Sequence, residues 1–450
     1  MAKPLRAGAA TSNITPSLGC SLNGGMNDRN ATRVHDELHA RCLVLDDGDT
    51  LLGLVVCDNC AIPTDVIDAA KHAVHAHARM LPDHMLVSAT HTHSAPTAVS
   101  SFQSDPDPEY LAFLALRIAD GLRRALANLA PARIGWGVGR EATQVFNRRW
   151  KLKPGKVPPN PFGAVDQVQM NPSVGSPDLV EPAGPIDPEL SLLAVQGADG
   201  RPLAVLANYS LHYVGGTEPT DVSADYFAMF ADRLQQILGA DRLDPPFVGI
   251  MSNGTSGNIN NIDFLHTRLG RQPYEQMRHV AHALAGEALR VYQAMEFRDA
   301  VELGIRESRL TLRRRLPEAG EVERARFILS QGQGGELNTL PEVYARETVL
   351  MAPWPPTIET VVQAIRVGDL GIAALPCEVF VETGLAIKEA SPLTPTLTIS
   401  LANGYAGYLP TPEHHQLGGY ETWRARSSFL EVEAEPQLRQ RALELLRQLV

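Results

Sequence analysis

The sequence lacks long apolar runs and blocks of charge of one sign. No stretch approaches the roughly 20 apolar residues that a membrane-spanning helix needs, and the N-terminal MAKPLRAGAATSNITPSLG has no continuous apolar segment of a signal peptide. The net charge of −11 is spread along the chain, without an acidic tail or a cluster of Lys and Arg. We therefore expect no transmembrane segment, no nucleic-acid partner and a cytoplasmic location.

Cysteine is also scarce, because 450 residues contain only 5, an odd and scattered set that argues against a disulfide framework. Cys57 and Cys60 have the spacing of a redox or zinc pair, but no second pair completes a four-sulfur site. We interpret both as buried residues at the end of a strand. Repeats of solenoid period and low-complexity tracts are absent as well.

Apolar runs and segments of helical period alternate along the chain. Residues 41–57 predict a β-hairpin around a DDGD turn. Helices are expected at 64–80, 109–129, 224–239, 274–294 and 434–449. The stretches 151–186, 350–358 and 400–423 are rich in Gly, Pro or Tyr without helical period, and predict long ordered loops. The fold class is therefore α/β, with mixed sheets flanked by helices, in one large domain or two modest ones.

Polar groups suited to chemistry follow several apolar strands. The segment SATHTHSAPT places His91 and His93 after one strand, and LAVLANYSLHYVGG places His212 after another. A Gly-, Asn- and Ser-rich loop follows the strand at 247–252, and Glu378 follows the run GIAALPC. Because loops at strand ends can reach a shared cleft, we expect these groups to meet.

The residue types at these positions suit a metal site. In extended backbone His91 and His93 point to the same side, although solvated or hydrogen-bonded histidines show the same pattern. His212 has a satisfied core histidine as its alternative. Glu378, in a nearly apolar run, needs a cation or hydrogen-bond donors when it is buried. Two imidazoles and a carboxylate are a common catalytic zinc set that leaves one position for water.

Other polar residues are weaker candidates. His414 and His415 are possible extra ligands, but adjacent residues rarely converge on one metal. Asp58 and His35 are candidates for orienting the ligand imidazoles, with a strand-end cap and a surface residue as the alternatives.

Eight segments resemble, in order, the catalytic domain of neutral (non-lysosomal, alkaline) ceramidases and their bacterial relatives. They are ITPSLG, VHDELHARCLVLDDG, SATHTHSAP, NRRW, NYSLHYVGG, FVGIMSNGTSGNINN, LPCEVFVETG and NGYAGYLPTPE. The resemblance covers nearly the whole chain. It implies a zinc hydrolase with a small-molecule or lipid-like acyl substrate.

The resemblance also implies roles for individual residues. The zinc ligands that it implies are His91, His212, Glu378 and Tyr408. The catalytic residues that it implies are His93 as an acid or base beside the metal, Arg148 near the substrate, Tyr420 facing the substrate, and the position of Asn260.

Asn260 is a departure from the family pattern, which has a serine in a G-[DN]-x-S-P-N loop. Asparagine cannot act as a nucleophile, but its amide can donate a hydrogen bond to an oxyanion. Thr255 and Ser256 could supply a hydroxyl only from a rearranged loop. The resemblance implies a single catalytic domain over residues 1–450, and we expect no counterpart of the family's immunoglobulin-like domain, because the tyrosine loop lies near the end of these 450 residues.

These departures predict a relative of the ceramidases for which ceramide is not the expected substrate. We expect a zinc-dependent hydrolase that cleaves the amide bond of an N-acyl compound by metal-activated water. A zinc-dependent esterase or lactonase and a non-catalytic metal-binding relative are the alternatives. The sequence does not determine the oligomeric state, and an oligomer is possible.

Overall fold

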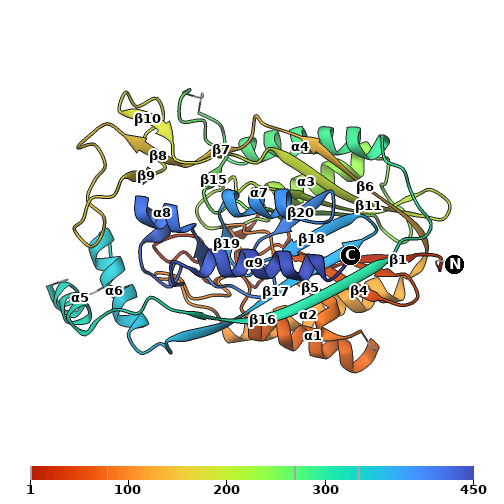
Figure 1. Cartoon of the computed structure of the whole chain (residues 1–450), viewed down its shortest axis with the longest axis horizontal. Coiled ribbons are helices and arrows are strands. Elements are labelled where there is room, and N and C mark those ends of the chain that lie inside the picture. Colours follow the sequence, from red (N-terminus) through yellow and green to blue (C-terminus); the bar gives the residue numbers. More distant parts are fainter. Residues whose placement is uncertain (1–2, 79, 268–269, 332–334) are drawn as a thin grey trace.

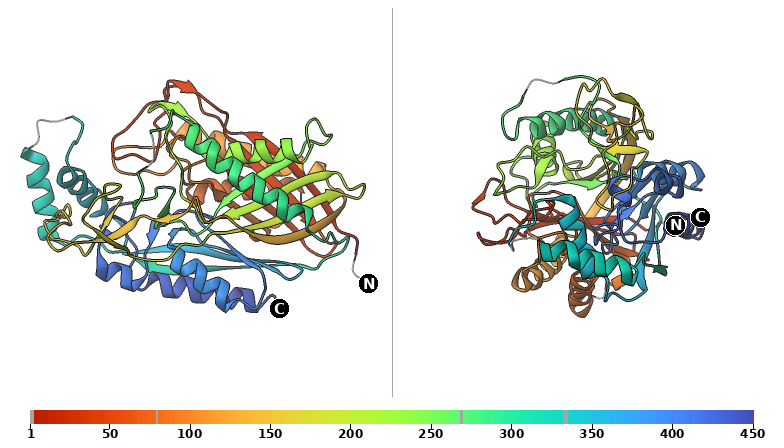
Figure 2. Two further views of the ribbon diagram at one scale, coloured as in Figure 1. Left: turned by 90° about the horizontal axis from the view of Figure 1, so that it is seen from above. Right: turned by 90° about the vertical axis from the view of Figure 1, so that its left-hand side faces the viewer.

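In the ranges that the structure describes, three walls of β-strands surround one apolar core, and helices cover the outside of each wall (Figures 1 and 2). The structure is a computed structural model that describes residues 3–78, 80–267, 270–331 and 335–450. The end-on view of Figure 2 shows the helices on three sides. The predicted α/β class with mixed sheets is confirmed.

The first wall contains the predicted hairpin at its centre. Its strands are β1 (Arg6–Asn13), β3 (His39–Asp46), β4 (Leu51–Cys57) and β5 (Met85–Ala89). β3 and β4 pair antiparallel, as expected from the DDGD turn, and β5 adds to β4 in parallel. The helices α1 (Thr64–Ala78) and α2 (Pro108–Ala127) pack outside this wall. The first helix was expected to reach about residue 80, and residue 79 lies outside the described ranges.

The second wall continues the first around a corner. Its strands are β6 (Ala130–Arg140), β11 (Glu189–Gly197), β12 (Pro202–Tyr209) and β14 (Val248–Asn253). Hydrogen bonds join both walls into one eight-stranded sheet, but β1 and β6 pair only at Arg6 and Ala7. The helices α3 (Asp225–Ile237) and α4 (Glu275–Gln293) cover its outer face.

The third wall is a separate four-stranded sheet. Its strands are β16 (Leu303–Arg313), β17 (Thr357–Val367), β18 (Leu370–Ala374) and β20 (Thr396–Ile399), with α7 (Val381–Ala390) and α9 (Ala434–Arg447) outside. Leu54, Ile250 and Ile372, from the three walls, are at most 2% exposed in the shared core. Each such side chain stabilises the fold by about 1.5–3 kcal/mol. Among the described helices, none is long and apolar enough to cross a membrane.

The expected long loops contain short elements. Residues 151–186 include most of a small sheet made of β8 (Arg149–Leu152), β9 (Val168–Met170) and β10 (Leu179–Pro182). The segment 400–423 contains β21 (Tyr408–Leu409), α8 (Pro412–Leu417) and the turn η2 (Tyr420–Thr422). Further elements are only two or three residues long, namely β2 (Arg33–Val34), β7 (Phe146–Asn147), β13 (Asp221–Val222), β15 (Ile259–Asn260), β19 (Glu378–Val379) and η1 (Pro82–His84). Elements of this length have no detectable period in the sequence.

A helical hairpin that the sequence patterns did not predict stands at one end of the molecule (Figure 1). It consists of α5 (Ala319–Gln331) and α6 (Leu340–Met351). α6 begins with a capping box, in which Thr339 and Glu342 satisfy each other's backbone N–H groups. The expected loop at 350–358 is therefore the short link between α6 and β17.

Candidate metal centre

The segments that leave several strands converge on one place. His91 follows β5, His212 follows β12, and Glu378 opens β19 just after β18. The Asn253 amide, at the end of β14, donates to the Thr90 carbonyl at 2.9 Å and so ties two of these segments together. His91 has a φ of 76°, a left-handed conformation that few non-glycine residues adopt. Strain of this kind clusters at functional sites.

The side chains of His91, His212 and Glu378 point at one another in a buried cluster. The two Nε2 atoms of His91 and His212 are 3.1 Å apart. Glu378 Oε2 lies 3.1 Å from His91 Nε2 and 3.7 Å from His212 Nε2. The structure therefore brings together the residues predicted as two imidazole ligands and one carboxylate ligand.

The hydrogen bonds on the far side of each ring determine which nitrogen carries the proton. His91 Nδ1 lies 2.8 Å from the Cys60 carbonyl oxygen, and His212 Nδ1 lies 3.0 Å from the Ser256 carbonyl oxygen. Because a carbonyl only accepts, each Nδ1 carries a proton, and each Nε2 of the neutral rings presents a lone pair. When both rings are neutral, two lone pairs and a carboxylate oxygen converge, and only a proton on His91 Nε2 or a cation can balance the charge of the carboxylate. A cation resolves this arrangement, and the donor set suits zinc.

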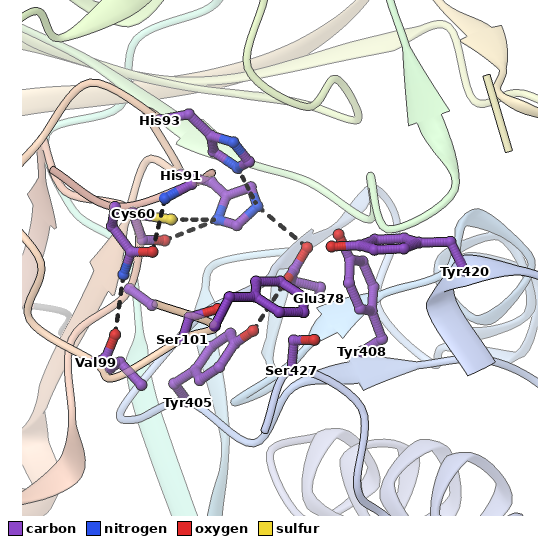
Figure 3. A pocket seen from close by; sticks show the side chains of 14 residues that line it. Cys60, His91, His93, Val99, Ser101, Glu378, Tyr405, Tyr408, Tyr420 and Ser427 are labelled. Atoms are coloured by element: carbon purple, nitrogen blue, oxygen red, sulfur yellow. Dashed lines mark hydrogen bonds and ion pairs between the residues drawn. The ribbon is translucent and has the colours of Figure 1, made fainter. Parts of the chain in front are cut away.

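Two tyrosines from the segment 400–423 flank Glu378. The Tyr405 hydroxyl donates to Glu378 Oε1 at 2.8 Å, and the Tyr408 hydroxyl lies close enough to help lower the pKa of the carboxylate. β19 and β21 pair in parallel, which places Glu378 opposite Tyr408. Figure 3 shows the hydroxyls of Tyr408 and Tyr420 directed toward Glu378. Tyr408 thus lies where the resemblance implies a fourth ligand.

The electrostatics of the cluster favour positive charge beside the carboxylate. Burial alone would lower the pKa of His91, but the Glu378 carboxylate and Cys60 outweigh it and raise this pKa well above its ordinary value. Burial raises the pKa of Glu378, whereas His91, Tyr408 and Arg148 lower it, and the net shift is downward. Glu378 is therefore ionised and attracts a cation.

His93 lies beside the cluster rather than opposite the carboxylate. Its Nε2 is 3.2 Å from His91 Nε2, and its ring stacks on Tyr213 with centroids 3.6 Å apart. Burial, followed by the charges of His91, Arg29 and Arg148, lowers the pKa of His93 well below its ordinary value. The ring is therefore neutral at pH 7.

Gly24 makes room for the His93 ring. A Cβ at Gly24 would lie 2.3 Å from Cγ of His93, and the φ of Gly24 is +95°. We expect Gly24→Ala to push the ring aside and to lower turnover by about 10- to 100-fold while the metal content is unchanged. Gly19 is a matched control, because its φ is +92° and a Cβ there meets nothing within 4 Å. Equal losses in Gly19→Ala and Gly24→Ala would contradict a role for the contact with His93.

Arg148 belongs to a buried ionic network that positions Tyr408. Its Nη2 donates to the Tyr408 hydroxyl at 3.1 Å and to the Gly257 carbonyl at 2.7 Å, and its Nε donates to Glu421 at 2.9 Å. Arg149 donates to the other oxygen of Glu421 at 2.6 Å. Arg148 therefore contacts Tyr408 directly, and its predicted place near the substrate stays a prediction.

Several residues that were weaker candidates for the site have other partners in the structure. The Asp58 carboxylate accepts from the backbone of His39 and from Arg41, and His35 stacks on Tyr274. Within the described residues, neither side chain contacts a ring of the cluster. The rings of His91 and His212 are oriented by backbone carbonyls instead. The candidates His414 and His415 are not in the cluster, and His414 binds Glu382 at 2.9 Å.

Asn260 is held outside the wall of the cavity at the cluster. Its amide donates to Asn171 Oδ1 at 2.7 Å, and its own oxygen accepts from the backbone N–H of Ile262 at 3.0 Å. Ser256 lies closer, since its hydroxyl is 3.5 Å from His212 Nδ1, but this hydroxyl donates to Asn253. The geometry therefore does not favour the predicted oxyanion role of Asn260.

The cavity beside the cluster is small, with a volume of about 40 Å³. Its wall includes His91, His93, Glu378 and Tyr420, and also Cys60, whose sulfur and carbonyl both face His91 (Figure 3). Sequence reasoning missed Cys60, Tyr405 and Glu421 as parts of the site. The signal for Cys60 was its spacing from Cys57, and the signal for the other two was adjacency to the motifs, because Tyr405 precedes Tyr408 in GYAGY and Glu421 follows Tyr420 directly.

No protein-family profile and no curated protein sequence matches the chain. A crystal structure of neutral ceramidase from Pseudomonas aeruginosa is similar, with a TM-score of 0.74 at 19% identity over 99% of this chain and 74% of that chain. A structure described as ceramidase complexed with C2 has a TM-score of 0.74 at 18% identity, over 99% and 75% of the two chains. The predicted resemblance is therefore confirmed at the level of the fold.

Proposed function

We propose that this chain is a zinc-dependent hydrolase that cleaves the amide bond of an N-acyl compound. The observation that carries the proposal is the convergence of His91 Nε2, His212 Nε2 and Glu378 Oε2 with both Nδ1 protons directed to backbone carbonyls. The fold shared with ceramidases, which are amidases, supports an amide as the scissile bond. The same proposal extends to residues 1–450 as one catalytic domain.

In this proposal His91, His212 and Glu378 hold the zinc, and Tyr408 contributes its phenolic oxygen. Bound zinc supplies Lewis acidity, which polarises a carbonyl and lowers the pKa of water. Glu378 is kept ionised for this purpose, and Tyr405 holds its second oxygen at 2.8 Å.

The other residues of the cavity then have distinct tasks. His93, as a neutral ring in the cavity wall, takes the proton of the attacking water and returns it to the leaving nitrogen. Tyr420, whose pKa burial raises, stays protonated and donates a hydrogen bond to the oxygen of the reacting carbonyl. Arg148 positions Tyr408.

A matched pair of acetyl compounds tests the proposal. The protein is stripped of metal with a chelator, reloaded with zinc, and assayed on p-nitroacetanilide and on p-nitrophenyl acetate. We expect amide hydrolysis that is lost on chelation and returns with zinc. Hydrolysis of the ester alone would indicate that the protein is an esterase and not an amidase. A zinc-loaded protein inert toward both compounds and toward longer acyl amides would indicate a non-catalytic relative.

A further inference from the structure

Two cavities lie on opposite sides of a pair of aromatic rings. The first is the cavity of about 40 Å³ at the metal centre, and its wall includes Phe102. The second has a volume of about 390 Å³, and its wall includes Tyr344. The rings of Phe102 and Tyr344 meet edge to face with centroids 5.9 Å apart. These two rings therefore separate the cavities.

The second cavity has an apolar side and a charged side. It lies between the α5–α6 hairpin and the loop that carries Phe162, and its apolar lining includes Phe162, Ile328 and Pro341. The ion pair of Glu321 and Arg424, at 3.0 Å, belongs to its charged rim. A volume near 390 Å³ lies within the range of ligand pockets.

Two arginine side chains hold the backbone of Phe102 in place between the two cavities. Its φ is 48°, and its carbonyl accepts from Arg426 Nη2 at 2.6 Å and also from Arg346. Arg426 in turn pairs with the fully buried Glu347 of α6 at 2.9 Å. A left-handed phenylalanine costs about 1–3 kcal/mol, which this network offsets. The position of the ring is therefore enforced by the hairpin.

We propose that Phe102, backed by Tyr344, restricts the substrate to short acyl groups such as acetyl. This inference rests on the proposed function, because it assumes that the acyl carbon lies at the metal centre. A cavity of about 40 Å³ holds only a few groups the size of a water molecule, since each needs about 10–15 Å³ on this measure. It has room for a short acyl group but not for a long alkyl chain, and Phe102 lies between it and the larger cavity.

A chain-length series tests this restriction. The zinc-loaded chain is assayed on the N-acetyl, N-butyryl, N-octanoyl and N-palmitoyl forms of one aromatic amine. We expect kcat/KM to fall by about 100-fold from acetyl to octanoyl in the wild type, and Phe102→Ala to recover octanoyl hydrolysis by about 10-fold or more relative to acetyl. Phe102→Gly is the second variant, because glycine adopts the positive φ without strain. Tyr344→Phe keeps the ring and is expected to leave the series unchanged.

A binding measurement separates this inference from the proposed function. The fluorescent fatty acid 11-(dansylamino)undecanoate is titrated into metal-free wild type and Phe102→Gly. We expect saturable binding to the variant at least about 10-fold tighter than to the wild type, since the joined cavities admit the chain. Inert acyl amides together with this binding difference would refute the hydrolase but support the partition. A wild type that cleaves or binds long chains as well as Phe102→Gly does would overturn the partition.

Discussion

Replacing His91 by alanine is expected to remove the bound zinc and the hydrolytic activity together. The variant loses the nitrogen that lies 3.1 Å from both His212 Nε2 and Glu378 Oε2, so only two of the three converging atoms are left. We expect elemental analysis to show a fall from about one zinc per chain to below about one tenth. Activity in zinc-containing buffer should fall by more than about 1000-fold, since loss of a mere supporting contact already costs 10- to 100-fold.

His72→Ala is the control for this loss. His72 is an exposed histidine on α1 whose Nδ1 also lies against a backbone carbonyl, that of Asp68 at 2.7 Å. It should keep its zinc and its activity. A His91→Ala protein that retains stoichiometric zinc, or a His72→Ala protein that loses it, would contradict the assignment of the centre.

Replacing Glu421 by alanine is expected to cause a large loss of stability. Glu421 is fully buried and accepts from two guanidinium groups, those of Arg148 at 2.9 Å and Arg149 at 2.6 Å. Without the carboxylate, two buried positive charges have no counterion. The free energy of unfolding, measured by urea denaturation, should fall by about 3–5 kcal/mol.

The exposed ion pair of Lys151 and Glu181 provides the comparison. Its distance of 2.8 Å is similar, but its side chains are 44% and 58% exposed. Glu181→Ala should therefore cost no more than about 1 kcal/mol. Similar losses in Glu181→Ala and Glu421→Ala would show that burial does not govern the contribution of Glu421.

The positions of the centre were predictable from the sequence because each ligand follows a regular element. The strands before His91, His212 and Glu378 are short continuous apolar runs, and the structure has strands at those places. The spacing of His91 and His93 in HTH does not determine whether both histidines or only one of them binds a metal. The answer depends on the three-dimensional arrangement, in which Glu378 faces His91 and His212 while His93 lies to the side.

The supporting contacts were predicted less well. Asp58 and His35 were candidates for orienting the rings, but the carbonyls of Cys60 and Ser256 do so. Every residue has a backbone carbonyl, so its use leaves no mark in the sequence. The place of Asn260 likewise depends on Asn171, which is 89 residues away along the chain.

The partition at Phe102 was beyond the reach of the sequence patterns. The α5–α6 hairpin has weak amphipathic character, with only Val322 and Ala325 buried on α5, so no helical stripe marked it. Its contact with Phe102 joins segments 244 residues apart through Arg346. Long-range polar contacts of this kind follow from the packing of the fold and not from local periodicity.

The most direct test of the metal centre is anomalous diffraction at the zinc edge from crystals of the zinc-loaded protein. We expect one strong peak between His91 Nε2, His212 Nε2 and Glu378, on the side of the Tyr408 hydroxyl. A peak elsewhere in the chain, or no peak at this cluster in active protein, would contradict the assignment of the metal centre.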